Sequence, residues 1–122
     1  MSKRILIADD EPNIVASLEF LMEQSGFEVR VVTNGREALE DIASFRPDLV
    51  LLDVMMPVKS GYEVCQALRA DPATEHIKII MLSAKGRELE VTKGLSLGAD
   101  AYVTKPFSTR ELVAQVKALL GA

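Results

Sequence analysis

The chain has 122 residues and a mass of 13.3 kDa, which corresponds to one domain spanning residues 1–122. Hydrophobic residues make up 48% and charged residues 26% of the chain, and these values exclude collagen-like, coiled-coil and disordered proteins. The net charge is −4 and no stretch is densely basic, so we expect no direct nucleic-acid partner. The single cysteine, Cys65, cannot form an internal disulfide and fits a reducing compartment.

The apolar runs of the sequence are far shorter than the ~20 residues that a membrane-spanning helix needs. The first residues, Met-Ser-Lys-Arg, are not followed by the apolar core of a signal peptide. We therefore expect a cytoplasmic protein with no membrane partner.

Five apolar blocks of strand length alternate with helical patterns along the chain. The predicted strands are Ile5–Ala8, Val29–Val32, Leu49–Leu52, Ile79–Leu82 and Ala101–Val103. Between and after them, apolar residues recur with helical spacing in five segments. The apolar face of the first helix is Ile14, Leu18, Leu21 and Met22, before Gly26, and that of the second is Ala38, Ile42 and Phe45, before Pro47. The third and fourth helices are predicted over Tyr62–Ala70 and Arg87–Leu97. The apolar face of the fifth is Leu112, Val116, Leu119 and Leu120.

Signals at the helix ends support two of these helices. Gly26 is a candidate C-terminal cap of the first helix. Ser108 and Glu111 have capping-box spacing at the start of the fifth. The fourth helix has the weakest amphipathic pattern of the five.

Strands that alternate with helices indicate an α/β fold, because parallel neighbours need a crossover connection that is usually helical. The first, third and fourth strands are continuously apolar, as central strands must be, whereas the second contains Arg30 and the fifth is short. The second and fifth strands are therefore predicted edges. The flavodoxin-like, doubly wound order 2-1-3-4-5 of a five-stranded parallel sheet with five helices meets this condition. Orders that permute the three central strands satisfy it as well.

Polar and charged residues follow four of the five strands. Asp9, Asp10 and Glu11 follow the first strand, and Asp53, Ser83 and Lys105 follow or lie near the ends of the third, fourth and fifth. Ligands of open α/β sheets bind beyond the carboxyl ends of the strands, so these residues form the predicted site.

Carboxylates this close together need a cation. Two of them about 5 Å apart repel by roughly 3 kcal/mol at an effective dielectric constant near 20. Oxygen ligands that are too few for a full cage favour Mg²⁺, which is often shared with phosphate oxygens. With Mg²⁺ and Lys105 screening an incoming anion and Ser83 supplying a hydroxyl, Asp53 is the carboxylate that we expect to attack phosphorus and become an acyl phosphate.

Simpler interpretations exist for each of these residues alone. One acid of the Asp9-Asp10-Glu11 run fits a cap of the first helix, with Pro12 in its first turn. Asp53 fits a loop acid, Ser83 a turn residue and Lys105 a solvated surface lysine. Their joint placement at strand ends favours the site.

The sequence resembles the receiver domain of two-component response regulators, the family of the chemotaxis response regulator. The resemblance spans the whole chain, and each of its motifs is weak alone but specific in combination. The motifs are Ile5–Pro12, Pro47–Asp53 with Met56-Pro57 and Gly61, Met81–Ala84, and Gly98–Tyr102 leading into Lys105-Pro106-Phe107.

The resemblance implies that Asp53 accepts a phosphoryl group from a histidine kinase, a phosphotransfer protein or a small phosphodonor, within a phosphorelay. It implies Mg²⁺ bound by Asp10, Asp53 and the backbone carbonyl of Met55, with Asp9 helping through water. It further implies that Lys105 pairs with the phosphoryl oxygens.

The resemblance also implies a switch. Ser83 moves to bond the phosphoryl group, Tyr102 turns inward, and the peptide bond before Pro106 is cis. These movements remodel the surface of the fourth helix, fifth strand and fifth helix, which controls a downstream protein or an output domain. The chain ends at Gly121-Ala122 without an output domain. We therefore expect a stand-alone receiver or a fragment of a larger regulator with a DNA-binding or enzymatic effector.

Two other classes fit the architecture less well. A Mg²⁺-dependent phosphatase that works through an aspartyl phosphate would carry a second acid two residues after Asp53, where Met55 stands. An electron-transfer flavoprotein would carry a hydroxyl- and glycine-rich loop after the first strand, where this chain has three acids. We expect the protein to catalyse only its own phosphorylation and dephosphorylation.

Overall fold

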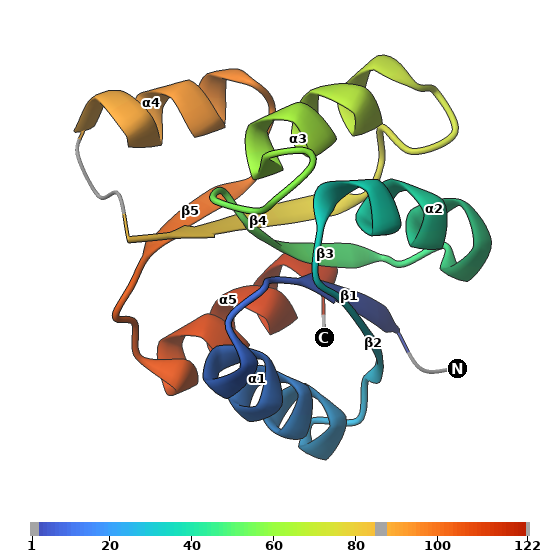
Figure 1. Cartoon of the computed structure of the whole chain (residues 1–122). Coiled ribbons are helices and arrows are strands. Elements are labelled where there is room, and N and C mark those ends of the chain that lie inside the picture. The colour runs from blue at the N-terminus through green and yellow to red at the C-terminus, as the bar shows by residue number, and fades with distance from the viewer. Residues whose placement is uncertain (1–2, 85–87, 122) are drawn as a thin grey trace.

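The computed structural model describes residues 3–84 and 88–121, which form a parallel sheet between two layers of helices (Figure 1). Strands and helices alternate along the chain as predicted. Their bounds are β1 (Arg4–Ala8), α1 (Pro12–Gln24), β2 (Glu28–Val32), α2 (Gly35–Phe45), β3 (Leu49–Asp53), α3 (Gly61–Ala70), β4 (Lys78–Ser83), α4 (Glu88–Ser96), β5 (Ala101–Thr104) and α5 (Thr109–Leu120).

The strand order is β2-β1-β3-β4-β5, and each neighbouring pair is parallel. This confirms the flavodoxin-like order and removes the permuted alternatives. Every residue of the central strand β3 is buried, whereas no residue of the edge strand β5 is. The polarity of the strands therefore predicted the two edges correctly, since only strands covered on both faces are apolar throughout.

The sheet separates two hydrophobic cores. In Figure 1, α1 and α5 lie on one face of the sheet and α2, α3 and α4 on the other. Alternate residues of β3 face the two layers: Val50 and Leu52 pack with α2 and α3, and Leu49 and Leu51 pack with α1 and α5. Both layers are needed to keep the central strands dry.

The helix ends follow local chemistry with one difference from prediction. Gly26 has φ +92° directly after the cap of α1, a conformation that glycine adopts without strain. Ser108 accepts a hydrogen bond from the backbone of Glu111, which is one of the two bonds of a capping box. The box with both bonds stands at α3, between Ser60 and Glu63, where sequence analysis had not placed one.

The predicted start of the fourth helix, Arg87, lies outside the described residues. Within the part of the chain that is described, no helix combines the length and the hydrophobicity that crossing a membrane requires. The parallel strands all direct their carboxyl ends to one edge of the sheet, and the loops at that edge hold the predicted site residues.

Candidate functional site

Four strand ends bring the predicted site residues together. Asp9 follows β1, and Asp53 and Ser83 are the last residues of β3 and β4. Asp53 is paired with Leu82, and Ser83 with Thr104, the residue before Lys105. The backbone N–H of Lys105 also donates to the carbonyl of Ser83 at 2.8 Å. The sheet register therefore assembles residues that are up to 96 positions apart in the chain.

Three carboxylates form the centre of this site. One carboxylate oxygen from each of Asp9, Asp10 and Asp53 lies within 4.8 Å of the others. Asp9 is fully buried and Asp53 is 3% exposed, whereas Asp10 faces solvent. An all-oxygen donor set with one open side fits Mg²⁺, which keeps several of its waters when it binds proteins.

Met55 lies beside this cluster. Its backbone N–H donates to Oδ1 of Asp53 at 3.1 Å, so the loop after β3 begins in contact with the carboxylate. Met55 itself is 57% exposed.

Lys105 supplies the positive charge of the site. Its ammonium Nζ lies 3.0 Å from Oδ2 of Asp9, 2.8 Å from Oε1 of Glu11 and 3.7 Å from Oδ2 of Asp53. The Lys105 side chain is only 9% exposed, so these are not contacts of a solvated surface lysine. The structure thus brings Asp9, Asp53 and Lys105 together as predicted.

Glu11 belongs to the acidic run of the predicted site, but sequence analysis assigned it no partner there and left a helix cap as its alternative role. It is the N-cap residue of α1, yet its side chain makes no capping bond, and Pro12 occupies the first turn. Its backbone N–H instead donates to Oδ1 of Asp9 at 2.9 Å, and its carboxylate binds Lys105. The acidic run therefore serves the site rather than the helix end.

The electrostatics of the site follow from burial. Burial, followed by repulsion from Asp9, raises the pKa of Asp53 from 3.8 to about 7, although the Met55 N–H and Lys105 oppose the shift. Burial alone lowers the pKa of Lys105, but the hydrogen bonds that its ammonium donates to Glu11 and Asp9 outweigh burial and raise that pKa. Lys105 is therefore a permanent cation, and a bound divalent cation would favour the ionised form of Asp53.

The two predicted switch residues lie on β4 and β5, on the side of the site next to α4. Ser83 is fully buried. Tyr102 is half-buried against the core of the α2, α3 and α4 layer, and its ring closely approaches Gly94 of α4. A side chain on Gly94 would begin 2.8 Å from the Tyr102 ring, so only glycine lets α4 pack this close.

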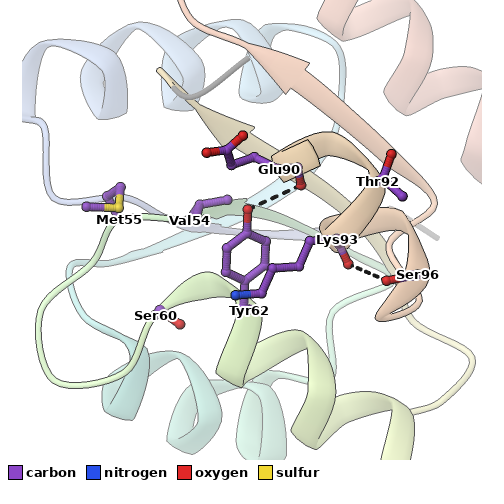
Figure 2. A pocket seen from close by; sticks show the side chains of 8 residues that line it. All are labelled: Val54, Met55, Ser60, Tyr62, Glu90, Thr92, Lys93 and Ser96. Atoms are coloured by element: carbon purple, nitrogen blue, oxygen red, sulfur yellow. Dashed lines mark hydrogen bonds between the residues drawn. The ribbon is translucent and has the colours of Figure 1, made fainter. Parts of the chain in front are cut away.

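A cavity of about 530 Å³ lies between the loop after β3, α3 and α4 (Figure 2). Tyr62 of α3 donates its hydroxyl to the backbone carbonyl of Glu90 at 3.3 Å, and the Lys93 ammonium lies 4.5 Å from its ring centre. Burial, followed by a hydrogen bond with Tyr102, raises the pKa of Tyr62 to about 12. Tyr62 therefore links α3 to α4 and to the predicted switch residue on β5.

The peptide bond between Lys105 and Pro106 is cis, which is the isomer that the resemblance implies.

Known protein families provide a direct comparison with this site and fold. The model of the response regulator receiver domain matches residues 5–117. The chain belongs to this family. Receiver domains of two-component response regulators are signalling modules, so the likeness of the motifs noted in the sequence reflects family membership.

Two curated relatives are similar over nearly the whole chain. The alkaline phosphatase synthesis transcriptional regulatory protein PhoP of Bacillus subtilis (strain 168) is 48% identical over 98% of this chain and 49% of its own length. The DNA-binding response regulator MtrA of Mycolicibacterium smegmatis is 45% identical over 98% of this chain and 51% of its own length. The receiver chain spans about half the length of these relatives.

Solved structures agree with the fold. The BeF3-activated receiver domain of DrrB has a TM-score of 0.91 and 34% identity to this chain, with complete coverage of both chains. The strands and helices of the present chain are therefore arranged as in a receiver domain.

Proposed function

We propose that this receiver domain is a phosphorylation-operated switch in which Asp53 accepts the phosphoryl group. The observation that carries the proposal is the position of the Asp53 carboxylate. It is buried, and one of its oxygens lies 3.7 Å from the Lys105 ammonium. A carboxylate oxygen of Asp53 also lies within 4.8 Å of carboxylate oxygens of Asp9 and Asp10. A carboxylate placed between a fixed cation and a cation-binding cluster is suited to attack a phosphoryl group.

The transfer forms one bond and breaks one. An oxygen of Asp53 forms the new O–P bond while the bond from phosphorus to the donor breaks, and its electron pair leaves with the donor. Lys105 balances the charge of the phosphoryl oxygens from one side. Asp10, Asp53 and the Met55 carbonyl would hold Mg²⁺ on the other, with Asp9 acting through water, and bound Mg²⁺ neutralises phosphoryl charge and aligns the reacting groups.

The output of the switch is a population shift. Phosphorylation biases two pre-existing arrangements, by as much as its interaction energy differs between them. Ser83 bonds the phosphoryl group, Tyr102 follows by turning further inward, and the surface of α4, β5 and α5 changes. The half-buried position of Tyr102 against Gly94 supports this coupling, because a movement of its ring requires α4 to respond.

We further propose that residues 1–122 form a single receiver domain of a cytoplasmic protein. Its phosphodonor is a histidine kinase or a phosphotransfer protein. The target is a downstream protein or an output segment outside this chain. The names of PhoP and MtrA favour DNA binding as that output, since this chain matches only about half of each.

Intact mass spectrometry after incubation with acetyl phosphate tests the proposal. The parent is expected to gain one phosphoryl group with Mg²⁺, and much less after removal of the metal by a chelator. Asp53→Asn should gain none. Glu40→Gln, a charge change at an exposed position of α2, serves as the matched control and should behave like the parent.

Phosphorylation of Asp53→Asn at the parental rate would show that the nucleophile is assigned wrongly. Sustained turnover of phosphate esters by the parent would instead indicate a phosphatase. If acetyl phosphate does not react, beryllofluoride provides a second probe, and a parent that binds neither is not a phosphorylation switch.

A further inference from the structure

We propose that Glu11 competes with the phosphoryl group for the ammonium of Lys105 and thereby favours the unphosphorylated state. The inference rests on the proposed phosphorylation of Asp53. It assigns Glu11 as a positioning residue that acts through Lys105 and sets how readily the site accepts an anion.

The hydrogen bonds of Lys105 provide the first step. A lysine ammonium has three N–H donors. Glu11 at 2.8 Å and Asp9 at 3.0 Å take two of them, and both distances are within hydrogen-bond range. Asp53, at 3.7 Å, is beyond it. In this arrangement Lys105 is therefore held toward the loop after β1 and away from the residue that would carry the phosphoryl group.

The two competing acids differ in how firmly they are held. Asp9 is fully buried, and its second oxygen accepts the backbone N–H of Glu11. The Glu11 side chain is 55% exposed and has no capping bond to α1. Water can replace Lys105 as the partner of Glu11 at little cost, whereas a desolvated Asp9 has no such replacement. The hydrogen bond from Lys105 to Glu11 is therefore the one that breaks more easily.

Phosphorylation therefore includes an exchange of partners. Lys105 directs the released N–H toward the phosphoryl oxygens, and the Glu11 carboxylate turns to solvent. When the phosphoryl group leaves, Glu11 binds Lys105 again. A variant without the Glu11 contact begins with Lys105 already available, so it should bind phosphoryl-like anions more tightly by roughly threefold, the effect of an exposed ion pair.

The test compares four versions of the 122-residue chain in Mg²⁺: the parent, Glu11→Gln, Glu11→Asp and Glu19→Gln. Glu11→Gln removes the charge, and Glu11→Asp keeps the charge but shortens the side chain that reaches Lys105. Glu19 lies with Asp9 and Asp10 around a surface hollow, so its variant removes a nearby charge without touching Lys105. Beryllofluoride affinity is measured by NMR titration, and the rate of phosphorylation by acetyl phosphate is measured by intact mass.

The NMR titration also observes Lys105 directly, through its side-chain ammonium signal in protein with ¹⁵N-labelled lysine. We expect this signal to differ between the parent and Glu11→Gln in the free proteins and to coincide once beryllofluoride is bound. A merely structural role of Glu11 would not produce this convergence.

Both Glu11 variants should bind beryllofluoride roughly threefold more tightly and accept phosphate faster, while Glu19→Gln should stay within about twofold of the parent. Unchanged or weaker binding by the Glu11 variants overturns the inference, as does an equal gain in Glu19→Gln, which would assign the effect to charge alone. If the parent binds no beryllofluoride and accepts no phosphate, the proposed function fails, and this inference fails with it.

Discussion

Two cationic side chains each connect distant segments of this fold, but their surroundings differ. Lys105 lies at the carboxyl edge of the sheet and faces three carboxylates, those of Asp9, Glu11 and Asp53. Arg69 of α3 lies near the start of β4 and faces one carboxylate, that of Asp100.

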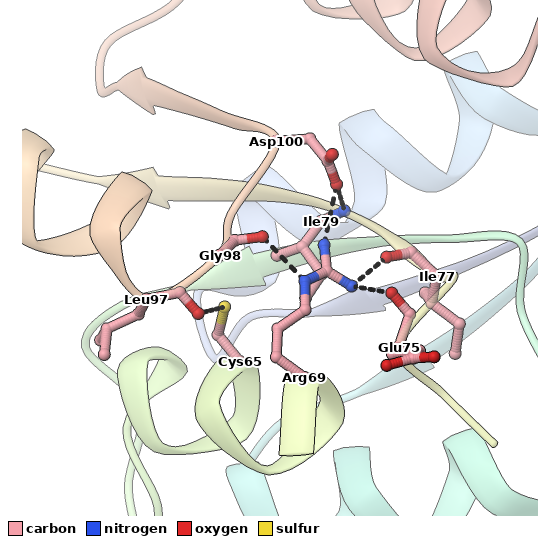
Figure 3. Close-up of polar contacts among 8 residues, drawn as sticks. All are labelled: Cys65, Arg69, Glu75, Ile77, Ile79, Leu97, Gly98 and Asp100. Carbon is pink, nitrogen blue, oxygen red and sulfur yellow. Dashed lines mark hydrogen bonds and ion pairs between the residues drawn. The ribbon is translucent and has the colours of Figure 1, made fainter. Parts of the chain in front are cut away.

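Backbone carbonyls provide most of the acceptors around Arg69 (Figure 3). Its guanidinium donates to the carbonyls of Gly98 at 2.8 Å, Glu75 at 2.9 Å and Ile77 at 2.6 Å, and to Oδ2 of Asp100 at 2.9 Å. These bonds connect α3 to the loops before β4 and β5. The Arg69 cluster is defined as these five residues, of which Glu75 contributes only its backbone carbonyl. Within the contacts of the cluster, the positive charge of Arg69 is balanced by the negative charge of Asp100.

The comparison separates a structural cluster from a functional one. The Arg69 cluster has matched charges and satisfied donors, so it can stabilise the fold but has little to offer a ligand. The Lys105 site has more negative than positive charge, and one of its buried carboxylates has a pKa near neutrality. Its balance improves when a cation binds, which is a property of sites that bind ligands.

The strongest test of this distinction is Arg69→Met, which preserves much of the side-chain length but removes every donor. Three carbonyls and the Asp100 carboxylate lose their partner, and at about 1 kcal/mol each we expect unfolding to become easier by about 3–4 kcal/mol. Urea unfolding followed by circular dichroism measures the change. Arg69→Met protein that remains folded should still accept a phosphoryl group from acetyl phosphate at nearly the rate of the parent.

Arg36→Met on the exposed surface of α2 is the matched control and should change the free energy of unfolding by less than about 0.5 kcal/mol. A loss below about 1 kcal/mol in Arg69→Met would mean that the Arg69 cluster is not a major structural element.

The sequence predicted the sheet because its strands differ in the polarity of their side chains. It predicted the strand ends less well. Asp53, Ser83 and Thr104 each extend a strand by one residue beyond its apolar block. Ladder hydrogen bonds are made by backbone groups, and they continue through a polar residue as readily as through an apolar one. A hydrophobicity pattern therefore ends before the strand does.

The candidate site was predictable for the same reason that the sheet was, since parallel strands gather their carboxyl ends at one edge. The contacts of Arg69 were not, because three of its four acceptors are backbone carbonyls, which every residue possesses. The partner of Glu11 was also hidden. A glutamate before Pro12 fits a helix cap equally well, and only the position of Lys105 in space decides between the two roles.

The second test concerns Asp53, where removal of a charge should increase stability. Its pKa is about 7 in the folded protein and 3.8 as an ordinary side chain. Between these values the folded protein holds a proton that the unfolded chain has released, so the parent loses stability as pH rises from about 4 to 7. Asp53→Asn does not lose stability in this way. Above pH 7 its free energy of unfolding should exceed that of the parent by about 2 kcal/mol, and by no more than roughly 4 kcal/mol.

Urea unfolding at several pH values without divalent cations measures this difference, which should disappear toward pH 4. Saturating Mg²⁺ should reduce it at neutral pH, because a cation that binds the folded parent stabilises that state. The Arg69→Met variant should show the same pH dependence as the parent. Lower stability of Asp53→Asn at pH 8 would mean that the carboxylate is already compensated in the folded protein.

The smallest expected change in the free energy of unfolding comes from an exchange of aspartate for asparagine in the Arg69 cluster. Asp100→Asn keeps an oxygen that can accept the backbone N–H of Ile79, now 2.8 Å from Oδ2, but it removes the charge that faces Arg69. Both side chains are about one quarter exposed, so we expect a loss of about 1 kcal/mol by urea unfolding, reduced in high salt. The exchange of aspartate for asparagine should therefore destabilise the protein at Asp100 and stabilise it at Asp53. Equal signs at the two positions would contradict the distinction, because the sign depends on whether burial and like-charge repulsion outweigh the counter-charge of the carboxylate, as they do at Asp53.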